Sequence, residues 1–136
     1  MDLMQVAGKY PVPKGASSIL GVEVSGYIVG LGLGCKRDDL IIGDKVMALL
    51  NGGGYAQYAT CDERTVIKVT DDIDLKQMAA TPEAFMTAYQ LTFNLVANTQ
   101  PGQTLLLHAG SSSIGQAAGK LLYYFISLCI FYLLFY

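Results

Sequence analysis

The 136-residue sequence lacks the features that mark several broad classes of protein. With only 4 prolines and 52% hydrophobic residues, it is neither a collagen-like nor a disordered chain. Its formal net charge is −2, and its 9 lysines and arginines are scattered along the chain, so it offers no basic patch. We therefore expect no nucleic-acid partner. The length allows one hydrophobic core at most.

Cysteine and histidine are also scarce. The 3 cysteines (Cys35, Cys61 and Cys129) have no C-x-x-C spacing and accompany a single histidine, which excludes a disulfide framework and a zinc knuckle. We expect the cysteines to be buried as small apolar residues, and no metal site. The N-terminus lacks the apolar stretch of about 7–15 residues that a secretory signal needs, so a reducing, cytoplasmic setting is expected.

Charge is absent from one end of the chain. Residues 121–136 contain no charged side chain, although they hold 7 of the 14 aromatic residues. As a helix these 16 residues would span about 24 Å, short of the roughly 30 Å hydrocarbon core of a bilayer. Two explanations stay open: a membrane anchor that borrows helix from the residues before Lys120, or a frame or splice artefact at the point where the composition changes.

The first half of the sequence has the pattern of an antiparallel β structure. Strand-like segments occupy residues 19–29, 41–50, 55–61 and 65–69, and each ends in turn residues. No helix-length stretch separates them, which predicts a meander or barrel. Gly30, Gly32 and Gly34 are spaced like a phosphate-binding motif, but a charged turn follows them, so we expect bends within the β structure.

The second half has an α/β pattern. Thr81, Pro82 and Glu83 supply a helix cap, a first-position proline and an acid in the first turn, predicting a helix that runs to about residue 96. Its expected buried stripe is Ala84, Ala88, Leu91 and Leu95. A short apolar segment at 104–108 then predicts the first strand of a buried parallel sheet, with another helix beginning near residue 116.

The loop between that strand and helix, residues 109–115, is the most informative motif. Small residues there would let backbone N–H groups and the positive helix end face an anion. No lysine follows Gly115, which excludes a nucleoside-triphosphate loop, and G-x-S-x-G is absent, which excludes a hydrolase elbow. A dinucleotide loop with Ser113 at its middle glycine position remains, as does an ordinary strand-to-helix turn. The single histidine, His108, is expected to be a core residue at the strand end.

Ordered segments of the sequence also resemble one family. They are DLMQ (2–5), GAS (15–17), ILGVEVSG (19–26), GDKVMALL (43–50), GGGYAQY (52–58), AATPEAFMTAYQ (79–90) and HAG (108–110). Over residues 2–120 the chain resembles the zinc-free medium-chain dehydrogenases/reductases, in their quinone oxidoreductase branch. Members carry further segments on both sides, so the resemblance implies a chain truncated at both ends.

The resemblance implies an α/β plus β fold: a partial GroES-like β-barrel over residues 1–80, followed by the start of a Rossmann dinucleotide-binding domain over 81–120. The composition adds a third part that the family does not explain, an apolar helix-like tail of uncertain origin over 121–136. The implied activity is hydride transfer from NADPH to a quinone or an α,β-unsaturated carbonyl, with an incomplete fragment expected to be inactive alone. Full-length relatives are expected to be homo-oligomers. The alternative is a non-catalytic membrane-associated or interaction protein that uses the tail.

Candidate site residues follow from the same resemblance. The residue matched by Tyr10 lines the substrate pocket, where its phenol could bind a carbonyl oxygen, although Tyr10 could equally pack on the neighbouring prolines. The residue matched by Thr87 lies near the nicotinamide. The expected pyrophosphate contacts are Ala109, Gly110, Ser112, Ser113, Ile114 and Gly115. Val22 stands where zinc-dependent relatives carry histidine, so no metal ligand is expected there.

Overall fold

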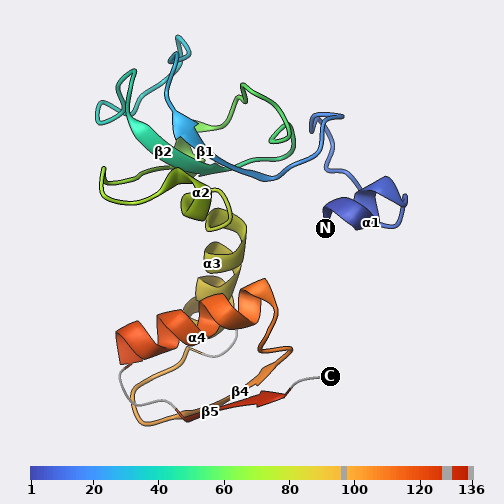
Figure 1. Ribbon diagram of the computed structural model, residues 1–136, viewed down its shortest axis with the longest axis vertical. Coiled ribbons are helices and arrows are strands. Elements are labelled where there is room, and N and C mark those ends of the chain that lie inside the picture. The colour runs from blue at the N-terminus through green and yellow to red at the C-terminus, as the bar shows by residue number, and fades with distance from the viewer. Residues whose placement is uncertain (96–97, 127–129, 135–136) are drawn as a thin grey trace. The chain divides into compact units, whose positions relative to one another are not determined.

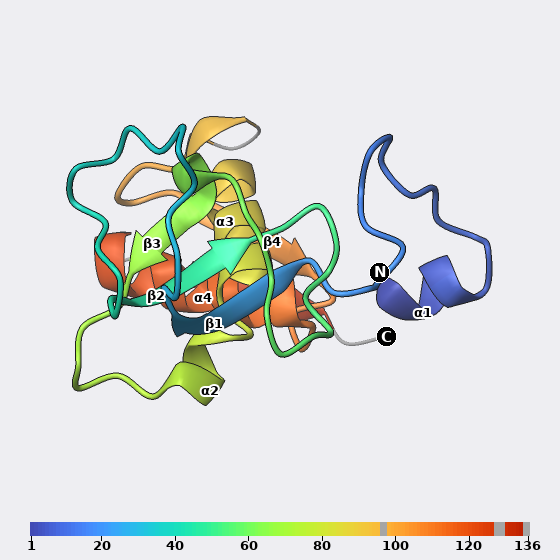
Figure 2. The same ribbon diagram turned by 90° about the horizontal axis from the view of Figure 1, so that it is seen from above.

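The computed structural model describes residues 1–95, 98–126 and 130–134, with α-helices, 3-10 and π turns and five strands among them. The chain forms two compact units, Met1–Pro82 and Glu83–Tyr136. Figure 1 labels helices and strands of both units, and Figure 2 adds the label of β3. Each unit is described by itself below.

The first unit is built around a three-stranded antiparallel sheet. Its elements are α1 (Asp2–Val6), β1 (Glu23–Tyr27), β2 (Lys45–Leu49), the 3-10 helix η1 (Glu63–Thr65), β3 (Val66–Lys68) and α2 (Leu75–Met78). The strand order is β1-β2-β3, and both pairings are antiparallel. Figure 2 shows the three strands side by side. The predicted meander is therefore confirmed for this part of the chain.

Strand register brings the core residues of this unit into one row. Val24 lies opposite Ala48, and Ala48 lies opposite Val66. Because side chains directly opposite one another point to the same face of a sheet, the three residues share one side. Leu40 and Leu50, from the ends of the adjoining loops, complete this core.

The predicted strand at residues 55–61 is wrong. The residues of this segment are exposed, and no described strand pairs with it. The segment is short and follows a glycine-rich turn, as strands often do, but a strand exists only where a neighbour accepts and donates its backbone hydrogen bonds. The expected burial of the cysteines is also wrong for Cys35, which is half-buried, and for Cys61, which is exposed. Cys129 lies outside the described residues.

The bends expected at Gly30, Gly32 and Gly34 are confirmed, because no helix follows them before β2.

The second unit contains a βαβ arrangement. Its elements are α3 (Pro82–Tyr89), the π-helix η2 (Gln90–Asn94), β4 (Thr104–His108), α4 (Ser113–Ile126) and β5 (Ile130–Leu134). β4 and β5 are parallel, with Thr104 opposite Ile130, and α4 connects them. Figure 1 shows α4 lying across the two strands. Small residues of α3 and α4 form the core against Leu107: Ala84, Ala88, Ala117 and Ala118.

The predicted helical stripe is only half correct. Ala84 and Ala88 are buried, but Leu91 and Leu95 are 43% and 73% exposed. The cause is the π turn, in which the N–H of Leu95 donates to the carbonyl of Gln90, five residues earlier. This wider turn rotates the later residues away from the core. Thr92 takes the buried place instead, and its hydroxyl donates to the carbonyl of Ala88 at 2.7 Å.

The expected helix-like tail is also wrong for residues 130–134. Residues 121–126 continue α4, and Leu122 is fully buried, whereas 130–134 form β5 and complete the βαβ arrangement. A uniformly apolar segment carries no periodicity that separates helix from strand, so only pairing with β4 decides it. Among the described residues, no helix has the length and apolar character needed to cross a bilayer.

The sheet of the second unit is covered on one face. Leu105 and Leu107 of β4 are half-buried, while Thr104, Leu106 and His108 are exposed. The expectations of a buried sheet and of a core position for His108 are therefore wrong. The two helices pack on the face that carries Leu107, and the alternation of a strand leaves its other side chains outside.

Candidate cofactor-binding site

A tight turn carries the chain from β4 to α4. Ala109 adopts a φ of 53°, in the left-handed region that few residues other than glycine enter. The turn closes through a hydrogen bond of 2.9 Å from the N–H of Ser112 to the carbonyl of Ala109. Gly110 is buried, whereas Ser111, Ser112, Ser113 and Ile114 are exposed. The end of the strand and the start of the helix are thus joined by a short loop of small residues.

Gly115 allows the helix to approach this loop closely. A Cβ at this position would lie 2.6 Å from the carbonyl oxygen of Ala109 and 2.7 Å from the Cα of Gly110. Both are backbone atoms, so neither can swing aside. Glycine is therefore required for packing the first turn of α4 on the loop, the role of the last glycine in a dinucleotide loop.

Two side chains hold the loop in place. The hydroxyl of Ser112 accepts a hydrogen bond of 3.1 Å from the N–H of Gly115, which caps the helix. The side-chain amide of Gln116 donates to the carbonyl of Ser111 at 2.8 Å. The sequence reasoning did not assign Gln116 a role. Its position in the first helical turn, within reach of the loop carbonyls, is the signal that could have found it.

The first turn of α4 contains backbone N–H groups that donate to no acceptor in the described part of the chain. The N–H groups of Ser113 and Ile114 have no protein acceptor in the part of the chain that the structure describes. The positive end of the helix dipole adds to their attraction for an anion. Glu83 and Lys120 are the only charged residues of the sequence from 83 to 136, so the loop itself carries no acidic side chain. Small side chains, spare donors and no competing acid fit a phosphate group.

The structure brings six of the eight candidate residues together. Ala109, Gly110, Ser112, Ser113, Ile114 and Gly115 all lie in this loop and the first turn of α4. Thr87 lies half-buried in α3, and no hydrogen bond of the described residues joins it to the loop. Tyr10 belongs to the first unit, in the loop after α1, and is 44% exposed. The roles assigned to all eight residues stay predictions.

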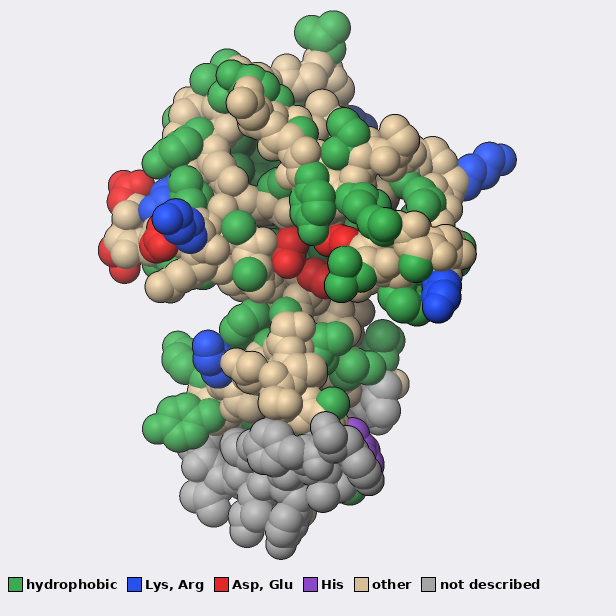
Figure 3. All heavy atoms as spheres, turned by 45° about the vertical axis from the view of Figure 1, so that its right-hand side comes forward, with side chains coloured by type: hydrophobic (Ala, Val, Ile, Leu, Met, Phe, Trp, Pro, Cys, Tyr) green, Lys and Arg blue, Asp and Glu red, His purple; other side chains and the backbone are tan. Residues whose placement is uncertain are grey.

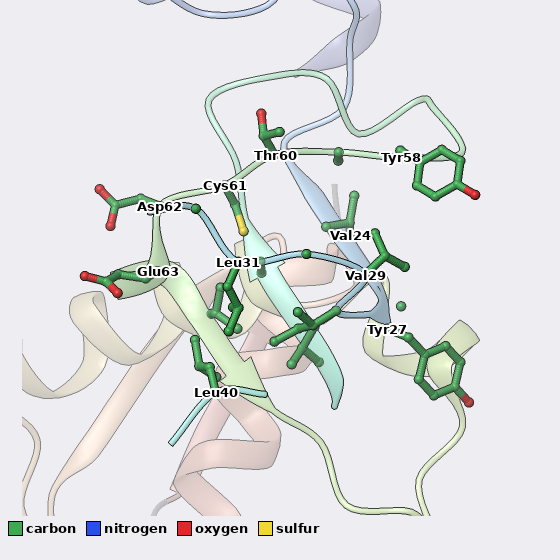
Figure 4. A pocket seen from close by; sticks show the side chains of 18 of the residues that line it. Val24, Tyr27, Val29, Leu31, Leu40, Tyr58, Thr60, Cys61, Asp62 and Glu63 are labelled. Atoms are coloured by element: carbon green, nitrogen blue, oxygen red, sulfur yellow. The ribbon is translucent and has the colours of Figure 1, made fainter. Parts of the chain in front are cut away.

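The first unit has a cavity of its own, of about 970 Å³. It opens on the core face of the sheet, where Val24, Val46, Ala48 and Val66 line it. Figure 4 shows Val24, Leu31 and Leu40 around the cavity, with Tyr27 and Tyr58 at one end. Tyr10 is not among the lining residues. The cavity is thus the hollow of a sheet whose apolar face is only partly covered, separate from the predicted substrate contact.

The thiols beside this cavity are poor nucleophiles. A hydrogen bond to the carboxylate of Glu63 raises the pKa of Cys35, and the same bond lowers the pKa of Glu63. Partial desolvation by neighbouring groups and then the negative charge of Asp62 raise the pKa of the Cys61 thiol. Glu63 also accepts the N–H groups of Lys36 and Arg37, at 2.6 and 3.1 Å, so it is held in place. A raised pKa keeps a thiol protonated near neutral pH, which argues against covalent chemistry here.

The described residues contain no group of three or more side chains placed to hold a metal ion. On the face of the molecule in Figure 3, lysine and arginine side chains lie in several separate places. Among the described residues, the loop of the second unit combines small side chains with N–H donors that lack a protein acceptor.

Comparison with known proteins agrees with the two-part architecture. Residues 1–71 match the model of the alcohol dehydrogenase GroES-like domain. The chain is 35% identical over 121 residues to the human synaptic vesicle membrane protein VAT-1 homolog-like, an alignment that covers 89% of this chain. The chain belongs to the medium-chain dehydrogenase/reductase family. The family expected from the ordered segments is thereby confirmed.

Solved structures of this family support the fold over nearly the whole chain. The JamJ enoyl reductase in its apo form superposes with a TM-score of 0.80 at 28% identity, over 96% of this chain and 40% of that one. The mycobacterial Rv1454c complexed with NADPH gives a TM-score of 0.82 at 25% identity, over 97% of this chain and 39% of that one. The chain spans 28% of the length of the human relative. The GroES-like part of the predicted fold is confirmed.

Proposed function

We propose that this chain supplies the GroES-like part and the phosphate-binding start of a Rossmann domain to an NADPH-dependent reductase. The proposal rests on the loop from Ala109 to Gly115. In this loop only glycine fits at position 115, and the N–H groups of Ser113 and Ile114 have no acceptor among the described residues. A relative of the same family was solved with NADPH, and another is an enoyl reductase. The reaction we propose is hydride transfer to a quinone or an α,β-unsaturated carbonyl.

The chain's own residues have separate roles in this proposal. NADPH, when bound, supplies the hydride. The N–H groups of Ser113 and Ile114 would bind the pyrophosphate, and Ser112 and Gln116 would keep the loop in the binding conformation. The phenol of Tyr10 would donate a hydrogen bond to the substrate's carbonyl oxygen, where negative charge develops as the hydride arrives. A proton from water then completes the reduction, on the oxygen of a quinone or on the α-carbon of an α,β-unsaturated carbonyl.

We further propose that the chain binds its cofactor weakly and turns over slowly by itself. The ribose contact of a dinucleotide site is usually an acidic residue about 20 positions after the loop, or an arginine nearby for the 2′-phosphate. No charged residue follows Lys120 in this sequence. NADPH and NADH should therefore bind with similar affinity, since nothing charged on the second strand distinguishes them.

A fluorescence titration of the full chain with NADPH and with NADH tests cofactor binding. We expect saturable binding of both, and about fivefold tighter binding in Ser113→Gly, which removes the side chain beside an N–H group that lacks a protein acceptor. Ser111→Gly is the matched control, because only the backbone carbonyl of Ser111 takes part in the loop, and it should leave the affinity unchanged. Absence of saturable binding, or equal effects of the two variants, would contradict the proposed site.

Turnover is tested separately with NADPH and an enone or quinone acceptor. We expect the chain alone to stay below about 0.1 s⁻¹, well under the median of about 10 s⁻¹ for enzymes. Tyr10→Phe should lower the residual rate about 10- to 100-fold without changing cofactor affinity. Turnover near the enzyme median would refute slow catalysis, and an unchanged rate in Tyr10→Phe would remove Tyr10 from the mechanism.

A further inference from the structure

The outer edge of β1 carries backbone groups that pair with no described strand. β1 lies at one end of the sheet order β1-β2-β3, so only one of its edges meets a neighbour. The N–H of Leu50 donates to the carbonyl of Val22, directly before β1, and hydrogen-bonded pairs recur at every second residue of an antiparallel ladder. The N–H and C=O groups of Ser25 and Tyr27 therefore point away from β2.

A second stretch of backbone without partners lies on the cavity of the first unit. Residues 56–60 are exposed, and their N–H and C=O groups form no hydrogen bond within the part of the chain that the structure describes. Both this stretch and residues 25–27 line the cavity of about 970 Å³. Figure 4 shows Tyr58 and Thr60 along one border of the cavity and Tyr27 along another. Two sets of available backbone groups thus border the same cavity.

The opposite edge of the sheet is covered by side chains. The Arg37 guanidinium donates to the carbonyl of Val66 in β3 at 2.7 Å. The Lys68 ammonium, on the same strand, donates to the carbonyl of Asp39 at 2.8 Å. β1 contains neither lysine nor proline, the residues with which proteins often protect an exposed edge. Its outer edge is therefore available to another strand.

The lining of the cavity favours a peptide over a small polar ligand. Its floor is the apolar core face of the sheet. Asp62 and Glu63, the two charged residues among those lining it, already have partners. Asp62 forms an ion pair with Arg64 at 2.6 Å, and Glu63 accepts the N–H of Lys36. Small-molecule sites usually orient their ligand with several convergent polar side chains, whereas backbone groups beside an apolar hollow suit an extended peptide.

We infer that the outer edge of β1 is a strand-acceptor site, which binds an extended segment of another polypeptide with apolar residues at alternate positions. This segment pairs with the N–H and C=O groups of Ser25 and Tyr27 and places its apolar side chains over the cavity. On its other side, residues 56–60 complete the ladder and gain the neighbour that a strand requires. The site needs neither the cofactor nor turnover, so its test is independent of the proposed reductase activity.

Fluorescence anisotropy of a labelled peptide added to the full chain tests the site. The probe is a short peptide in which valine alternates with threonine and lysine. We expect saturable binding with a Kd between about 1 and 100 μM. One control peptide has the same composition with its valines consecutive, and the other carries N-methyl groups on every second backbone nitrogen, which blocks one edge. Both should bind at least about tenfold more weakly, because one loses the alternation and the other loses backbone donors.

Tyr27→Pro tests the edge from the side of the protein. Proline removes an N–H that points away from β2, so the ladder within the sheet keeps its hydrogen bonds. The Kd of the peptide should rise at least about tenfold. Tyr27→Thr is the matched control: it keeps the N–H and suits a strand, so the Kd should change by about threefold at most. Circular dichroism checks the fold of both variants, and the N-methylated peptide tests the same hydrogen bonds on the unaltered chain.

Hydrogen exchange followed by mass spectrometry identifies the backbone groups that the peptide covers. We expect saturating peptide to slow exchange at residues 56–60 and 25–27 at least about tenfold. The amides of β3, on the far side of the sheet, should exchange at the same rate with and without the peptide. Unchanged exchange at residues 56–60 would refute their part in the ladder.

The remaining outcomes overturn the inference. Absence of saturable binding up to about 1 mM would leave no affinity in the range of peptide recognition. Equal binding of the peptide with consecutive valines would assign the cavity to any apolar ligand, and equal binding of the N-methylated peptide would exclude backbone pairing. Dimerisation that is lost in Tyr27→Pro, without peptide binding, would assign the edge to a second copy of the chain.

Discussion

Replacing Gly115 with alanine tests the close approach of α4 to the phosphate-binding loop. The new Cβ would lie 2.6 Å from the carbonyl oxygen of Ala109 and 2.7 Å from two atoms of Gly110. Because these are backbone atoms, the helix or the loop must shift, and overpacking of this kind costs about 1–3 kcal/mol. Alanine also gains about 1 kcal/mol over glycine within a helix, which partly offsets the cost.

Gly119→Ala separates these two effects. Gly119 lies in the same helix, one turn later, and nothing lies within 4 Å of a Cβ placed there. Its replacement should therefore stabilise the protein by about 0.5–1 kcal/mol through helix propensity alone. The difference between the two variants removes the propensity gain and leaves the clash, which we expect to be about 1–3 kcal/mol.

Urea unfolding followed by far-ultraviolet circular dichroism measures this difference. The helical signal reports mainly on the second unit, because α1 and α2 have only 5 and 4 residues. With an m value of about 2 kcal/mol/M, the midpoint of Gly115→Ala should lie about 0.5–1.5 M below that of Gly119→Ala. Gly115→Ala should also weaken NADPH binding. If both substitutions raise the midpoint equally, the loop does not contact the helix as described, and the reasoning for the candidate site fails.

Three further substitutions test other parts of the structure. Ser112→Ala should lower the free energy of unfolding by about 1 kcal/mol through loss of the α4 cap, whereas Ser111→Ala should change it little in thermal unfolding. Lys45→Met should cost about 1–2 kcal/mol in urea unfolding, because the ammonium donates to the carbonyls of Thr70, Asp71 and Ile73; an equal loss in Lys36→Met would refute this. The Lys68 ammonium, 2.8 Å away, and then the N–H of Ile41 lower the pKa of Asp44 below its usual value. The stabilisation is therefore complete above the unfolded pKa of about 4 and is lost as the pH falls through the lower folded pKa. Asp44→Asn should unfold more easily than wild type at neutral pH, and this difference should shrink as the pH falls below about 4; a constant difference would contradict the ion pair.

Local patterns predicted those elements whose stability depends on neighbours in the sequence. The meander follows from short strand-like segments that end in turn residues, such as those around Val24 and Ala48, and the helix beginning at Pro82 follows from its terminal residues. The loop from Ala109 to Gly115 was found because its small residues lie between an apolar strand and a helix start. Each of these patterns is contained within about 15 residues, so no distant contact was needed.

Other features depended on contacts that the patterns do not contain. The segment 55–61 is short and bounded by turn residues as a strand is, yet no described strand accepts its hydrogen bonds. Leu91 and Leu95 keep a helical spacing, but one π turn rotates them out of the core. Two side-chain hydrogen bonds, from the N–H of Gly115 to the Ser112 hydroxyl and from the Gln116 amide to the Ser111 carbonyl, depend on the exact geometry of the turn, which composition does not specify.

The charge-free residues 121–136 show most clearly which features the sequence determined and which the tertiary structure determined. The sequence by itself determined that residues 121–136 are apolar apart from Ser127, that no charged residue follows Lys120, and that a family pattern precedes them. The tertiary structure decided that residues 121–126 belong to α4 and 130–134 to a strand parallel to β4. The physical reason is that apolar side chains favour burial in either geometry, while the backbone hydrogen bonds that distinguish helix from strand depend on which partner lies beside them.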